Sequence, residues 1–153
     1  MRRVVVTGLG AITPVGNTAP ETWRAAVAGE SGIDWIRAFD ADGLPVRIAA
    51  EVKDYDPTGL AHPKELRRLD RNVVLALGAA KEAVADAGLN GFDPSRVGIV
   101  FGSAIGGLIG IVDQADTLRE RGPDRVSPYF IPSVLVDSAS GQLAISLGIR
   151  GPN

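Results

Sequence analysis

Residues 96–121 decide the fold, and they read RVGIVFGSAIGGLIGIVDQADTLRER. Residues 96–101 are mostly apolar and β-branched, which is typical of a strand buried on both faces of a sheet. A glycine loop follows at residues 103–107. Residues 108–121 then predict a helix that ends before Gly122 and Pro123. A strand, a glycine turn and a helix in this order indicate a layered α/β fold.

The start of the chain has the same order of elements. Residues 3–7 form a second short apolar run that predicts a buried strand, and a loop over residues 8–17 follows. Thr18 and Glu21 match a capping box, in which each side chain bonds the backbone amide of the other residue. We expect the helix that they begin to pass through Trp23 and end at Gly29.

The middle of the chain contains a strand pattern and a long helix pattern. Residues 46–52 alternate between apolar and other residues, which predicts a half-buried strand in a small hairpin or at a sheet edge. Pro63 is suited to a first helical position, and Gly88 to the end of a helix. Between them, apolar residues recur at spacings of three and four and predict one amphipathic helix: Leu66, Leu69, Val73, Leu77, Ala80, Val84 and Ala87.

A last helix is expected over residues 132–147. It carries Ala139, Ser140 and Gly141 in its middle, and small residues there would let another helix approach closely. Only two core strands, residues 3–7 and 96–101, are evident along the chain, and two strands make a poor sheet. We therefore expect these 153 residues to be part of a longer α/β protein.

Composition limits the function classes. A net charge of −2 gives no general attraction to nucleic acid or anionic lipid. No apolar run reaches the roughly 18 residues of a membrane span, and the N-terminus does not resemble a signal peptide. These features predict a cytoplasmic protein that binds neither membrane nor nucleic acid. The chain has no cysteine, which excludes disulfides, cysteine-based zinc sites and a cysteine nucleophile within it. His62, the single histidine, precedes Pro63 and is expected to cap a helix.

Two glycine motifs partly match nucleotide-binding patterns. Gly8 and Gly10 begin a dinucleotide fingerprint, but Thr13 stands where the third glycine is needed. The loop from residue 102 to 107 imitates a phosphate-binding loop, but Leu108 replaces the required lysine. This second loop is either a ligand-binding turn at a strand end or a compact βα turn, and spacing alone does not choose between them.

A basic cluster stands at the start of the long helix pattern, formed by Lys64, Arg67, Arg68 and Arg71. Cations are disfavoured near a helix N-terminus, so this placement is unusual. The cluster is either a solvated face or a dock for an acidic partner.

Seven segments carry a resemblance to one family: VVVTGLG (4–10), TPVGN (13–17), GESGI (29–33), KELRRLD (64–70), GSAIGG (102–107), SPYFIP (127–132) and RGPN (150–153). In this order they resemble the first part of the β-ketoacyl-acyl-carrier-protein synthases of type II fatty-acid synthesis, the synthase II group in particular. The resemblance implies a thiolase-like, five-layered αβαβα fold, of which this chain would be most of the first half.

The resemblance also implies a reaction. Members of the family catalyse a decarboxylative Claisen condensation of an acyl thioester, held on a cysteine, with malonyl-carrier protein. In the family that cysteine follows the Gly-Pro-Asn segment, and two histidines lie further on. No catalytic residue, metal ligand or cofactor site is therefore expected within residues 1–153, and this chain alone is expected to be inactive.

Several supporting residues carry over from the family. Ile105 matches the isoleucine that gates the acyl pocket, and Phe130 matches a phenylalanine that the partner subunit adds to it. The basic residues that match positions for docking the acidic acyl carrier protein are Lys64, Arg67, Arg68 and Arg125. Asp124 departs from the basic residue common beside Arg125, and Asp137 departs from the usual asparagine.

The family is homodimeric, and residues 127–147 match its interface sequence. The interface is expected to include Phe130, Ala139, Ser140 and Gly141. Two other readings stay open. One is a non-catalytic subunit such as the chain-length factor of aromatic polyketide synthases, and the other is a stand-alone binding module.

Overall fold

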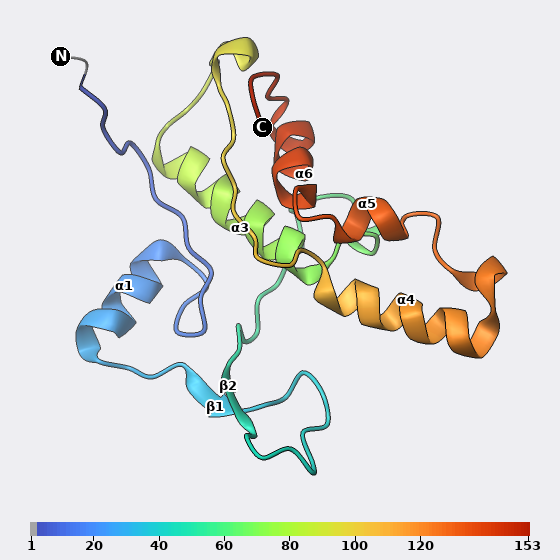
Figure 1. The fold of residues 1–153 in the computed structure, drawn as a ribbon. Helices are drawn as coiled ribbons and strands as arrows, with labels where there is room; N and C mark the ends of the chain where they lie inside the picture. Colours follow the sequence, from blue (N-terminus) through green and yellow to red (C-terminus); the bar gives the residue numbers. More distant parts are fainter. Residues whose placement is uncertain (1–2) are drawn as a thin grey trace. The chain divides into compact units, whose positions relative to one another are not determined.

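The computed structural model describes residues 3–153 (Figure 1). Its contacts divide the chain into two units. Unit 1 takes the chain up to Asp56 together with Gly78–Leu89, and unit 2 takes Pro57–Leu77 and Asn90–Asn153. Each unit combines segments that are distant in sequence.

Helix α1, Ala19–Ala28, lies in unit 1 and has the predicted ends. The Thr18 hydroxyl accepts a hydrogen bond from the Glu21 amide at 3.3 Å, and Gly29 closes the helix in the left-handed conformation with φ 72°. The second half of the predicted capping box is wrong. The Glu21 carboxylate accepts from the amide of Asn17 at 2.9 Å and not from that of Thr18, so it satisfies the residue before the cap.

Strand β1, Ile33–Trp35, pairs antiparallel with β2, Ile48–Ala50, and Figure 1 shows them as two short arrows side by side. The small hairpin predicted around residues 46–52 is confirmed. Its covered face was not the apolar one expected, because Ile48 and Ala50 are exposed and Ala49 is half-buried. Alternation decides which residues share a face of a strand, whereas the neighbouring elements decide which face is covered.

The predicted buried strands at residues 3–7 and 96–101 are wrong for this structure, since neither run is a strand. The side chains of Val4 and Val100 are fully exposed. Residues 97–99 instead lie beside residues 151–152, joined by two backbone bonds: Ile99 donates to the Pro152 carbonyl at 2.8 Å and Gly151 donates to the Val97 carbonyl at 3.2 Å. A strand needs a paired neighbour, and a β-branched run looks the same in sequence whether or not it is paired.

The helix predicted over residues 63–87 is two helices. Helix α2, Pro63–Leu66, ends before helix α3, Arg71–Asp86, begins. Asp70 starts α3: its carboxylate accepts from the Asn72 amide at 3.3 Å and its carbonyl accepts from the Val73 amide at 3.1 Å. Aspartate is a favoured N-cap residue, so Asp70 favours the start of a separate helix at this point.

The glycines of the first loop allow close packing within unit 1. A side-chain carbon on Gly8 or Gly10 would overlap the backbone of α3. The amides of Leu9 and Ala11 donate to the carboxylates of Asp86 and Glu82, each at 2.9 Å. The loop therefore lies along α3, and this packing explains its glycines without a dinucleotide.

The remaining elements of unit 2 are helices. They are the short helix η1, Pro94–Arg96; α4, Leu108–Arg121; the short helix η2, Pro123–Arg125; α5, Phe130–Val134; and α6, Ser138–Leu147. The single helix predicted over residues 132–147 is thus interrupted. At the break the Ser138 hydroxyl donates to the Pro132 carbonyl at 2.7 Å, and the Gly107 amide donates to the Val134 carbonyl at 3.1 Å. Across residues 3–153, no helix has the length and apolar character needed to cross a membrane.

Candidate functional site

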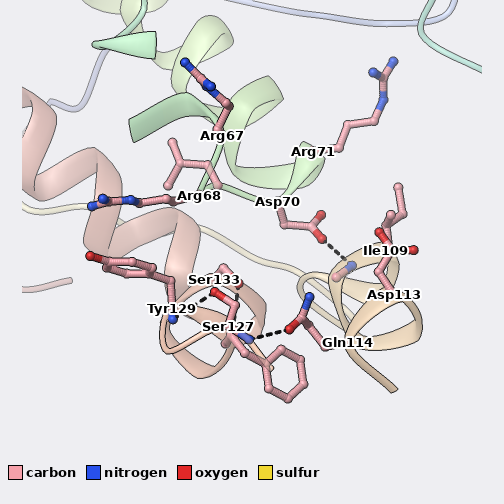
Figure 2. Close-up of a pocket in the computed structure, with 13 residues that line it drawn as sticks. Arg67, Arg68, Asp70, Arg71, Ile109, Asp113, Gln114, Ser127, Tyr129 and Ser133 are labelled. Carbon is pink, nitrogen blue, oxygen red and sulfur yellow. Dashed lines mark hydrogen bonds between the residues drawn. The ribbon is translucent and has the colours of Figure 1, made fainter. Parts of the chain in front are cut away.

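Unit 2 contains a pocket of about 260 Å³ between the end of α2 and the start of α3, helix α4, and the segment that leads into α5 (Figure 2). Three arginines and two aspartates line it together with aromatic and aliphatic groups. The lining residues are Arg67, Arg68, Leu69, Asp70, Arg71, Ile109, Gly110, Asp113, Gln114, Ser127, Tyr129, Phe130 and Ser133.

Residues 64–71 are named here the basic segment. Residues 67–71 of this segment form one wall of the pocket. The Arg67 side chain folds back on its own helix, where its Nε donates to the Pro63 carbonyl at 3.3 Å. The Arg68 guanidinium lies 4.1 Å from the centre of the Tyr129 ring, a cation–π distance. Figure 2 shows Arg68 alongside that ring, whereas Arg67 and Arg71 point away from it.

The predicted docking cations form no ion pair with any carboxylate in residues 3–153. They are Lys64, Arg67, Arg68 and Arg125, and all four are exposed. Other cations do form ion pairs, among them Arg37, Arg47, Lys53 and Arg119. Lys64, Arg67 and Arg68 therefore remain available to pair with an acidic surface.

His62 is the N-cap of α2, as predicted. Its Nδ1 accepts from the Lys64 amide at 3.2 Å, while its own amide donates to the Glu65 carboxylate at 3.3 Å. An imidazole nitrogen held by a backbone amide serves the helix, so the histidine acts as a structural cap. Among residues 3–153, no group of three or more His, Asp or Glu side chains is placed to hold a metal ion.

The opposite wall of the pocket positions Phe130. The Gln114 side chain of α4 accepts from the Ser127 amide at 2.7 Å, and the Ser127 hydroxyl accepts from the Tyr129 amide at 3.2 Å. These two bonds, drawn in Figure 2, fix the turn that precedes Phe130. The structure thus brings together three of the predicted site residues, since Arg67, Arg68 and Phe130 line one pocket.

Ile105 stands outside this pocket, on the loop of residues 102–107. Its side chain is exposed, and it precedes two glycines with packing roles. Gly106 has φ +83°, and a side-chain carbon there would overlap the Val134 carbonyl. The Ser103 hydroxyl accepts from the Gly106 amide at 3.0 Å. This packing explains the glycines as part of a compact turn before α4, although no strand precedes that turn in this structure.

The remaining predicted residues are dispersed. Arg125 belongs to η2 and does not line the pocket. Ala139 and Ser140 are buried within the chain itself, whereas a side-chain carbon on Gly141 would meet open space. Their role in a dimer stays a prediction.

Sequence reasoning missed Asp70, Gln114 and Tyr129 as members of the site. Asp70 accepts from the Gly110 amide at 2.9 Å through one carboxylate oxygen, while the other bonds Asn72. Aspartate is a favoured N-cap residue, so Asp70 could have been read as the start of a new helix. No local pattern points to its bond with Gly110, which is 40 residues away.

Comparison with known proteins identifies the family of this chain. Residues 1–153 match the family model for the N-terminal domain of β-ketoacyl synthases. Among curated proteins, the chain is 43% identical over 154 residues to 3-oxoacyl-[acyl-carrier-protein] synthase 2 of Coxiella burnetii, and 44% identical to the same enzyme of Synechocystis sp.. Each match covers 99% of this chain and 37% of the relative.

Solved structures agree with these matches. The ishigamide ketosynthase/chain length factor is similar with a TM-score of 0.88 and 30% identity, over 99% of this chain and 38% of that one. A β-ketoacyl synthase from Burkholderia phymatum is similar with a TM-score of 0.81 and 25% identity, over the same shares of the two chains. The chain therefore belongs to the β-ketoacyl synthase family and has part of its thiolase-like α/β fold.

Proposed function

We propose that this chain is the N-terminal part of a 3-oxoacyl-[acyl-carrier-protein] synthase, an acyltransferase that elongates fatty acids. The observation that carries the proposal is the identity of 42–44% to curated relatives of that name over 99% of this chain. The chain spans 37% of the length of those relatives and has no cysteine. We therefore place the nucleophilic thiol, and every other group that touches the reacting atoms, outside residues 1–153.

The proposed reaction has two stages. A cysteine thiolate first attacks the carbonyl of an acyl thioester, and the thiol of the carrier protein leaves. Malonyl-carrier protein then loses carbon dioxide, and the carbanion that results attacks the enzyme-bound acyl group and expels the thiolate. The product is a 3-oxoacyl thioester on the second carrier, and the cysteine is free again.

In this reaction residues 1–153 would form part of the docking surface for the carrier protein and part of the wall of the acyl tunnel. Lys64, Arg67 and Arg68 are exposed cations without ion pairs in residues 3–153, which suits an acidic carrier protein. Arg125 is proposed as a fourth docking cation. Ile105 and Phe130 are proposed to border the acyl chain, and Phe130 lines the pocket beside Arg67 and Arg68.

We further propose a cytoplasmic homodimer. Phe130, Ala139, Ser140 and Gly141 are proposed to lie at its interface, and the open space around Gly141 leaves room there for a neighbouring helix. Substitution of Gly141 by leucine would then weaken the dimer in sedimentation analysis, whereas Gly102→Leu would not. Gly102 has equally open space and, like Gly141, has no left-handed backbone conformation that a side chain would strain.

The test of the function compares two proteins: residues 1–153 alone, and the protein at the full length that its gene encodes. Each is mixed with acyl- and malonyl-carrier protein, and the release of carbon dioxide and formation of 3-oxoacyl-carrier protein are measured. We expect both products from the full-length protein and neither from residues 1–153. A full-length protein that folds and makes neither product would contradict the proposal.

A second candidate is a non-catalytic chain-length-factor subunit. One solved structure similar to this chain is named as a ketosynthase/chain length factor. The gene sequence after the codon for Asn153 separates the two candidates. A cysteine codon within the next ten residues supports the synthase, and glutamine in its place supports the chain-length factor.

A further inference from the structure

The carboxylate of Asp70 accepts hydrogen bonds from the first turns of two helices. One oxygen accepts from the Asn72 amide at 3.3 Å and caps α3, which begins directly after Asp70. The other accepts from the Gly110 amide at 2.9 Å, in the first turn of α4. Helix α4 has no cap of its own, because Gly107 stands at its N-cap and makes no side-chain cap bond. Asp70 therefore supplies that cap from another part of the chain.

Two glycines lie directly against the Asp70 carboxylate. A side-chain carbon on Gly107 would lie 2.9 Å from the Asp70 carboxylate, and one on Gly110 would lie 3.1 Å from it. Two glycines thus make the space in which the carboxylate reaches the helix. The contact between Asp70 and the start of α4 is therefore a specific packing feature of unit 2.

The two ends of the contact belong to different parts of the proposed site. Asp70 lies two residues after Arg68 in the basic segment. Gly110 belongs to the helix turn that follows the loop carrying Ile105, and the Gly107 amide of that loop bonds the Val134 carbonyl at 3.1 Å. A shift of the basic segment would accordingly be passed to the glycine loop through one carboxylate.

We propose that Asp70 is a positioning residue through which an acidic carrier protein, bound on the basic segment, fixes the loop that holds Ile105 at the acyl tunnel. The inference rests on the proposed function. A bound partner changes a distant loop only if the two sites are energetically coupled, and such coupling is reciprocal. In this chain the coupling would depend on the bond between Asp70 and Gly110.

Two substitutions separate this bond from simple helix capping. In Asp70→Ser the hydroxyl can still cap α3, but it is too short to reach Gly110. Asp70→Asn keeps the length of the side chain but has one acceptor oxygen, so it can satisfy only one of the two helices. Asp93→Ser is the matched control. Asp93 is the N-cap of η1 in the same unit and accepts from the Ser95 amide at 2.9 Å, without a long-range bond among those found for residues 3–153.

The experiment uses the full-length protein and two acyl donors. One donor is acyl-carrier protein, and the other is the same acyl group on N-acetylcysteamine, which has no carrier. We measure kcat/KM for acyl transfer from each donor and divide the value for acyl-carrier protein by the value for the N-acetylcysteamine thioester. We expect the ratio to fall about fivefold or more in Asp70→Ser and Asp70→Asn, in line with ordinary coupling strengths, and to stay constant in Asp93→Ser. Transfer from the small donor should persist.

A second readout does not depend on the variants being active. Hydrogen exchange of peptides over residues 102–110 should slow when carrier protein binds the wild type, and should not slow in Asp70→Ser. Equal losses with both donors, or unchanged exchange in the wild type, would overturn the inference while leaving the proposed function intact. A wild type that accepts the acyl group from neither donor would instead overturn the proposed function, and the inference with it.

Discussion

The guanidinium of Arg68 lies 4.1 Å from the centre of the Tyr129 ring and so joins the basic segment to the turn before α5. Both groups are on the surface, and Tyr129 directly precedes Phe130, which lines the pocket. The contact fixes one docking cation in a defined place and leaves it exposed to a partner.

Replacing Tyr129 by leucine removes the aromatic face on which Arg68 lies. We expect the free energy of unfolding to fall by about 0.5–1 kcal/mol, the usual strength of an exposed cation–π contact. Urea denaturation measures this change. Tyr129→Phe keeps the face and should match the wild type. Adding Arg68→Ala to the leucine variant should cost nothing further, and a full additional loss would show that the pair does not interact.

The first glycine loop makes a steric prediction. A side-chain carbon on Gly10 would overlap the Ala79 carbonyl in the backbone of α3, which cannot turn aside as a side chain could. We expect Gly10→Ala to lower the free energy of unfolding by about 1–3 kcal/mol. Gly102→Ala is the control, since no atom lies within 4 Å of the added carbon. Its stability should be unchanged or slightly raised, and equal effects at both positions would contradict the packing described here.

Acid should weaken the β1–β2 hairpin through Asp34. A hydrogen bond from Lys53 at 2.8 Å, followed by one from the Trp35 amide at 2.8 Å, lowers the pKa of Asp34 from 3.8 to about 2. Because the folded pKa is the lower one, the carboxylate stabilises the fold above pH of about 4, and this contribution is lost as the pH falls toward about 2.

Carbon-13 NMR of the Asp34 carboxyl group, followed against pH, measures that value. In Lys53→Met the pKa of Asp34 should rise toward 3.8, because the largest cause of its depression is gone. Arg37→Met should raise the pKa of Asp34 less, since the charge of Arg37 contributes least to its depression. A Lys53 variant with an unchanged titration would disprove the assignment.

Local signals in the sequence predicted those elements whose ends are determined locally. Helix α1 begins at Thr18 and ends at Gly29 because a hydroxyl cap and a left-handed glycine act within one turn. The cap at His62 was predicted for the same reason. The resemblance to a known family, and not spacing, marked Arg67 and Arg68 as docking residues and Phe130 as a residue of the acyl pocket. Their common place in one pocket was not predicted.

Elements that depend on distant contacts were predicted less well. The apolar spacing of Leu66, Leu69 and Val73 continues across the break between α2 and α3, so periodicity could not reveal it. The break exists because Asp70 caps α3 and bonds Gly110 in α4. The runs at residues 3–7 and 96–101 have the composition of strands, but a strand forms only where another strand pairs with it.

The most direct test of the proposed role is the affinity of the full-length protein for acyl carrier protein after a charge reversal in the basic segment. Arg67→Glu is compared with Arg24→Glu, because both arginines are exposed and both donate Nε to the carbonyl four residues earlier, at 3.3 and 3.4 Å. At low ionic strength we expect the dissociation constant to rise about tenfold or more for Arg67→Glu alone, and the difference to shrink in concentrated salt. Equal affinities for the two variants would contradict a carrier-protein dock on residues 64–71.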